Sequence, residues 1–236
     1  MPELQNNTKN KKARNHPDPS RNNLIIRSWL VVSIACIALL IMALQANLPF
    51  PLLSRDVFAI AEIPVYFALF SNLGVLCLCA ASAICLFSAA VINHHYKDRT
   101  NTSFLLLSGF VTLGLMIDDF FMLHEEVFPS RLGASEESIY LVYITVFVLY
   151  LFRSRRAILQ TNFILFFVAI GFLGISMLTD RIIEGLPFLS NLLSTEQEFF
   201  LEDGLKFLGI IAWLFYFIDT SLTAVHSYIS RSAMEG

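Results

Sequence analysis

Long runs of apolar residues, separated by short polar segments, form the main pattern along this chain of 236 residues. Because about 20 helical residues cross a hydrocarbon core of roughly 30 Å, each run of that length predicts one membrane-spanning helix. We therefore expect an all-α fold, a polytopic integral membrane protein built as a bundle of six transmembrane helices. The six runs are residues 24–44, 64–92, 104–123, 137–152, 161–179 and 202–224.

The composition supports this interpretation and excludes several other classes of protein. Hydrophobic side chains make up 56% of the chain and charged ones only 15%, which a water-soluble domain of this size does not show. Four scattered Cys do not indicate a disulfide scaffold. No phosphate-binding glycine loop or nucleophile motif is present, and nucleic acid is not expected as a partner.

One membrane domain with two short tails is the expected organisation. Residues 1–23 form a basic tail rich in Asn and Lys, which predicts disorder and contact with anionic lipid headgroups. Residues 24–228 hold the six helices, and residues 229–236 form a short second tail. The long polar leader favours an uncleaved first helix over a signal peptide.

The basic residues predict the orientation in the bilayer, because Lys and Arg are retained on the cytoplasmic side of short loops. With the N-terminus inside, six crossings place 12 of the 16 basic residues in the cytoplasm. Both termini are then cytoplasmic, and we expect a plasma (inner) membrane location. The same topology leaves 14 of the 19 acidic residues at the outer side. The outer end of the protein is therefore strongly acidic.

Two of these acids lie within the third apolar run, where an unpaired charge costs at least a few kcal/mol. Asp118 and Asp119 are about one turn inside its outer end and need partners. At about 100° per residue, Asp118 and Glu125 share one helix face, while Asp119 and Glu126 share the adjoining face. His124 lies about 120° from Asp118, so it joins these acids only if the helix ends or bends before it.

Ionisable groups from two other helices are expected at the same depth, and acids outnumber bases among them. Even complete pairing leaves six carboxylates to be hydrated, protonated or bound to a cation. Hard oxygen ligands would favour a divalent cation such as Mg²⁺, Ca²⁺ or Mn²⁺ over Zn²⁺. These further groups are Asp180, Arg181, Glu184, Glu202, Asp203 and Lys206.

The leading functional hypothesis is an outer-leaflet cavity that binds a cation or proton, as a transporter component. One alternative is a metal-dependent membrane enzyme acting on a lipid-like substrate, with His124 or Glu125 as the base. Another is a structural or assembly subunit, in which Lys206 and Arg181 neutralise the buried acids. The proposed cation ligands are Asp118, Asp119, Glu125, Asp180, Glu202 and Asp203.

Small residues predict where helices approach each other closely. The second run is rich in Ala, Ser and Cys between residues 77 and 90. Gly109 and Gly114 in the third run, and Gly171 and Gly174 in the fifth, suggest further close contacts.

Overall fold

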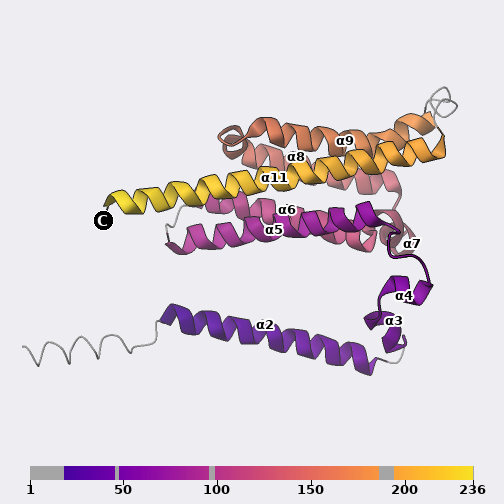
Figure 1. Ribbon diagram of the computed structural model, residues 1–236, viewed down its shortest axis with the longest axis horizontal. Coiled ribbons are helices and arrows are strands. Elements are labelled where there is room, and N and C mark those ends of the chain that lie inside the picture. Colours follow the sequence, from indigo (N-terminus) through magenta and orange to yellow (C-terminus); the bar gives the residue numbers. More distant parts are fainter. Residues whose placement is uncertain (1–18, 46–47, 96–98, 186–193, 236) are drawn as a thin grey trace, which may run out of the picture. The chain divides into compact units, whose positions relative to one another are not determined.

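The computed structural model describes residues 19–45, 48–95, 99–185 and 194–235, and every regular element in these ranges is helical. The chain forms two compact units, Met1–Val65 and Tyr66–Gly236. Figure 1 shows the elements in chain order. They are α2 (Pro19–Leu44), α3 (Phe50–Ser54), α4 (Val57–Ala61), α5 (Leu69–His95), α6 (Arg99–Phe121), the π-helical turn η1 (Leu123–Val127), α7 (Phe128–Leu132), α8 (Glu136–Leu159), α9 (Phe163–Gly185) and α11 (Thr195–Glu235).

The described residues of the first unit form one long helix and two short ones. The long helix α2 carries the apolar stretch Ser28–Leu44. The side chain of Asp56 caps α4 by accepting a hydrogen bond of 2.8 Å from the backbone N–H of Phe58. Such caps satisfy one of the free N–H groups at a helix start.

Within the described ranges, four helices are long and apolar enough to cross a membrane, by length and composition. Their apolar segments coincide with four of the six predicted crossings, the second, third, fourth and sixth. The first and fifth predicted crossings coincide with the shorter apolar stretches Ser28–Leu44 and Phe163–Thr179. The four long segments are Leu69–His94, Thr100–Phe121, Glu137–Leu159 and Glu196–Ser230.

The helices α8 and α11, predicted from the fourth and sixth apolar runs, extend well beyond those runs. The prediction of 137–152 was too short, because α8 continues to Leu159 and includes three arginines. The prediction of 202–224 was also too short, because α11 has 41 residues. Apolar runs mark the part of a helix suited to hydrocarbon, whereas Arg and Lys are good helix formers that let the helix continue into water.

The second unit is organised around α11, which packs against α5 and α9, while α5 packs against α6 (Figure 1). Aromatic residues of α11 fill the centre of this unit. The ring centroids of Trp213 and Phe166 are 5.6 Å apart, and those of Tyr216 and Phe166 are 5.0 Å apart. These fully buried side chains fix α9 against α11.

Small residues allow α5 to approach its neighbours, as predicted. Ala81, Cys85 and Ala89 are almost completely buried along one face of this helix. On α6, a Cβ atom added at Gly109 would lie 2.7 Å from Leu86, so this glycine is required for the contact with α5.

Three other glycines do not have the packing role expected of them. Nothing lies within 4 Å of a Cβ added at Gly114, Gly171 or Gly174. The close approach of α9 and α11 occurs instead at Gly209, where an added Cβ would lie 2.7 Å from Leu173.

Hydrogen bonds join the helices inside the second unit. The Trp213 indole N–H donates to the Thr112 hydroxyl at 3.0 Å, and the hydroxyls of Ser108 and Tyr150 are 2.9 Å apart. In an apolar environment such bonds contribute to helix association, because their groups find no water to bond.

Replacing Gly209 by Ala should destabilise the protein by about 1–3 kcal/mol, because the added methyl group meets both the side chain and the backbone nitrogen of Leu173. Gly204→Ala is the matched control on the same helix, since an added Cβ there has nothing within 4 Å. Unfolding in detergent micelles measures both effects. Equal stability of the two variants would contradict the close α9–α11 contact.

Candidate functional site

The α-helical path is interrupted directly after α6, and this interruption builds the candidate site. The helix ends at Phe121, and Met122 has a left-handed conformation with φ of 50°. Such a conformation costs roughly 1–2 kcal/mol for a residue with a side chain. The backbone N–H groups of Glu126 and Val127 then donate to the Met122 carbonyl, which closes the turn η1. The chain downstream therefore leaves the helical path that the sequence suggested.

Asp118 in the last turn of α6 is surrounded by hydrogen-bond donors. Its carboxylate oxygens lie 3.1 Å from the backbone nitrogen and 2.7 Å from Nδ1 of His124. The hydroxyl of Tyr143, on α8, donates to the same carboxylate at 2.6 Å. Only 8% of the Asp118 residue is exposed. Three donors to one buried carboxylate stabilise its charged form.

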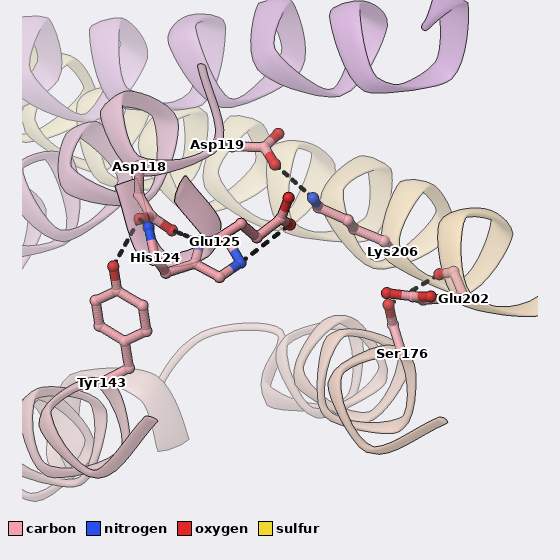
Figure 2. Close-up of polar contacts among 8 residues, drawn as sticks. All are labelled: Asp118, Asp119, His124, Glu125, Tyr143, Ser176, Glu202 and Lys206. Carbon is pink, nitrogen blue, oxygen red and sulfur yellow. Dashed lines mark hydrogen bonds and ion pairs between the residues drawn. The ribbon is translucent and has the colours of Figure 1, made fainter. Parts of the chain in front are cut away.

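His124 connects this buried carboxylate to an exposed one (Figure 2). Its Nε2 atom lies 3.2 Å from a carboxylate oxygen of Glu125, whose side chain is 56% exposed. The hydrogen bond to Asp118 raises the pKa of His124 above its ordinary value, with partial burial opposing the shift. The charges of Asp118 and Glu125 also raise this pKa, and Lys206 lowers it. The imidazole is therefore held between two acids and stabilised in its protonated form.

Asp119, the neighbour of Asp118, faces a different helix. One of its oxygens forms an ion pair with the ammonium group of Lys206 on α11. One expectation was that Lys206 neutralises a buried acid, and in the structure that acid is Asp119. The second oxygen of Asp119 is buried and has no hydrogen-bond partner in the described part of the chain. Figure 2 shows the two aspartates of α6 directed to separate partners.

The other predicted site residues take different positions around these two pairs. The backbone carbonyl of Glu202 accepts a hydrogen bond of 2.8 Å from the Ser176 hydroxyl (Figure 2). Glu126 and Asp203 are exposed. The side chains of Asp180, Arg181 and Glu184 lie outside the described residues.

The expectation that four carboxylates line one side of a continuous helix is wrong, because α6 ends at Phe121 before Glu125 and Glu126. His124 was expected to join the acids only if the helix ended or bent before it. The helix does end before His124, and this side chain contacts Asp118. Among the residues that the structure describes, no three His, Cys, Asp or Glu side chains are placed to hold a metal ion. The arrangement forms two charge pairs: Asp118 with His124, and Asp119 with Lys206.

Tyr143 belongs to the site but was not among the predicted site residues. Its ring stands edge-on to the His124 ring, with centroids 6.1 Å apart. A polar hydroxyl about two turns inside the start of α8, at the end of the bundle where α6 finishes, was the available signal. Sequence alone could not show which of the tyrosines in this helix faces Asp118.

Comparison with known proteins gives one match. The family model described as a domain of unknown function (DUF8692) matches residues 29–220. No curated protein and no solved structure matches the chain.

Replacing Tyr143 by Phe should destabilise the protein by about 1.5–3 kcal/mol, the usual range for a hydrogen bond to a charged group. The variant keeps the ring against His124 and removes only the donor to Asp118. Thermal unfolding in detergent micelles would measure the loss. Tyr66→Phe, at a ring that is 66% exposed, is the control and should change little. An unchanged stability of Tyr143→Phe would show that the charged form of Asp118 does not depend on this hydroxyl.

The raised pKa of His124 predicts the pH dependence of stability. Its contribution is fully present below the unfolded pKa of about 6.5 and is lost as pH rises through the higher folded pKa. The free energy of unfolding should therefore fall as pH increases above neutrality. In Asp118→Asn this fall should be smaller and begin at lower pH. Identical pH profiles for the two proteins would contradict the coupling.

Proposed function

The chain belongs to the DUF8692 family, a domain of unknown function, and from its own residues we propose that it is an integral membrane protein that binds a proton. The proton is held by His124 and Asp118, and this pair is the loading site of a transport process. The observation that carries this proposal is the position of the His124 imidazole, 2.7 Å from a buried carboxylate and 3.2 Å from an exposed one.

The proposal includes a direction for proton transfer. The exposed carboxylate of Glu125 collects a proton from water and passes it to Nε2 of His124. The buried carboxylate of Asp118 stabilises the imidazolium that results. Histidine changes its charge near physiological pH, and chains of acids and histidines are characteristic of proton relays in membrane proteins.

The proposal includes a topology of six crossings with both termini in the cytoplasm of an inner (plasma) membrane. The asymmetry of basic residues supports it, because 12 of the 16 lie on one side in this arrangement. The site then lies in the outer leaflet. The basic N-terminal tail would contact anionic lipid headgroups on the inner side.

Cation binding forms a second branch of the proposal. Its ligands would be acids of the predicted set that rearrange around Mg²⁺, Ca²⁺ or Mn²⁺, because no three described side chains are already placed to hold a metal ion. Proton binding is the branch that the described geometry favours, because the two aspartates of α6 already have protein partners. Elemental analysis of the purified protein would test the metal branch directly.

A structural role is the second candidate function, and one observation favours it. Both aspartates within α6 are accounted for, Asp118 by three donors and Asp119 by Lys206. Paired polar networks of this kind also fix helix packing. In this case the loss of His124 would lower stability and leave proton movement unchanged.

Proton flux into reconstituted vesicles separates the two candidates. The full chain is placed in vesicles that contain a pH-sensitive dye, and a membrane potential is imposed. We expect wild type to carry protons, and His124→Gln and Asp118→Asn to lose most of the flux. His226→Gln is the matched control, because His226 is exposed on α11 and remote in sequence from the pair. Equal flux in wild type and His124→Gln would overturn proton transport.

A further inference from the structure

The C-terminal half of α8 has one face packed against the bundle and an opposite face that is exposed. Tyr150, Ser154 and Ile158, spaced four residues apart, are its buried residues. The Tyr150 hydroxyl lies 2.9 Å from that of Ser108 on α6, which fixes the rotation of α8 about its own axis. At about 100° per residue, Phe152 and Arg156 then lie nearly opposite the buried row.

This exposed face is apolar until it reaches the end of the helix. Only 17% of the apolar segment of α8 is buried, the smallest share among the four long candidate spans. Leu141, Leu149 and Phe152 all lie on the exposed face, and each leaves more than 60% of its surface uncovered. At the membrane location proposed above, such a face contacts the acyl chains of lipids.

Three arginines lie where this apolar face ends. Arg153, Arg155 and Arg156 are all exposed, and in the described part of the chain none of them forms an ion pair with an acid. The guanidinium carbon of Arg155 lies 4.8 Å from the centroid of the Phe152 ring, within the range of a cation–π contact. A positive charge is therefore held directly beside the apolar face.

We propose that this end of α8 binds an anionic glycerophospholipid, a proposal that rests on the membrane location proposed above. A guanidinium group donates two parallel hydrogen bonds to a phosphate, which an arginine provides better than a lysine. Three such groups without a nearby acid repel the cationic part of a zwitterionic headgroup. The adjoining apolar face accommodates the acyl chains of the same molecule, which a free phosphate or a soluble acidic protein does not have.

Thermal unfolding of the full chain in zwitterionic micelles tests this site, with added dioleoylphosphatidylglycerol, dioleoylphosphatidylcholine or glycerol phosphate. We expect a saturable rise of the melting temperature with phosphatidylglycerol that the other two compounds do not produce. Phosphatidylcholine has the same acyl chains without the net charge, and glycerol phosphate has the charge without the chains. An equal rise with either of these compounds, or no rise with phosphatidylglycerol, would overturn the proposal.

Variants locate the effect at the end of α8. Arg156→Gln should weaken phosphatidylglycerol binding about fivefold, the usual effect of one basic residue at an anionic surface. Arg131→Gln is the matched control, because Arg131 is an exposed arginine on α7 that precedes α8, and it should leave the binding unchanged. Arg153→Gln, Arg155→Gln and Arg156→Gln combined should abolish the difference between the two lipids. Equal losses in Arg156→Gln and Arg131→Gln would overturn the assignment to α8.

The lipid site and the proton site fail in different measurements. His124→Gln should retain the full phosphatidylglycerol shift, because His124 contacts Tyr143 in the first half of α8 and not the arginines at its end. Absence of proton flux in wild type would overturn the proton site and leave the lipid shift as expected. Retention of the lipid difference after all three arginines are replaced would overturn the lipid site, whatever the result of the flux measurement.

Discussion

The cost of burying charge at the end of α6 is the constraint on which the rest of this site depends. Asp118 and Asp119 are consecutive, so they point about 100° apart and cannot share one partner. In an apolar environment each carboxylate must be compensated by groups of opposite charge or by hydrogen-bond donors. One aspartate is compensated by the turn after its own helix and by α8, and the other by α11. Two neighbouring residues thereby join four parts of the bundle.

This division gives the two charge pairs different surroundings. The pair of Asp118 and His124 is connected to water through an exposed acid, whereas Asp119 and Lys206 border a small cavity of about 20 Å³. Glu125 interacts electrostatically with both His124 and Lys206. A change of charge in one pair therefore alters the electrostatic environment of the other pair.

The sequence predicted the features that depend on composition and depth. Apolar runs located the helices, and the position of Asp118 and Asp119 in the third run showed that they need partners. Lys206 was recognised as a counter-charge for the same reason. The acid that pairs with Lys206 is determined by the rotation of α11 relative to α6. The periodic pattern of a single helix does not predict this rotation.

The role of His124 depends on the left-handed backbone conformation of Met122, which the residue types in this segment did not predict. Glycine or asparagine usually occupies a left-handed position, whereas here it is Met122, which the sequence gives no reason to expect there. A helix continued past Phe121 places His124 away from Asp118, and the observed turn places it in contact. The glycines of the third and fifth runs illustrate the same limit, since spacing alone did not distinguish packed glycines from open ones.

The protonation of His124 in the full chain, measured by histidine-selective NMR in lipid nanodiscs, tests the central claim most directly. The account predicts that this imidazole titrates above the value of a free histidine, and that Asp118→Asn moves the titration to lower pH. An imidazole that titrates as in a free peptide, unmoved by Asp118→Asn, would contradict the account.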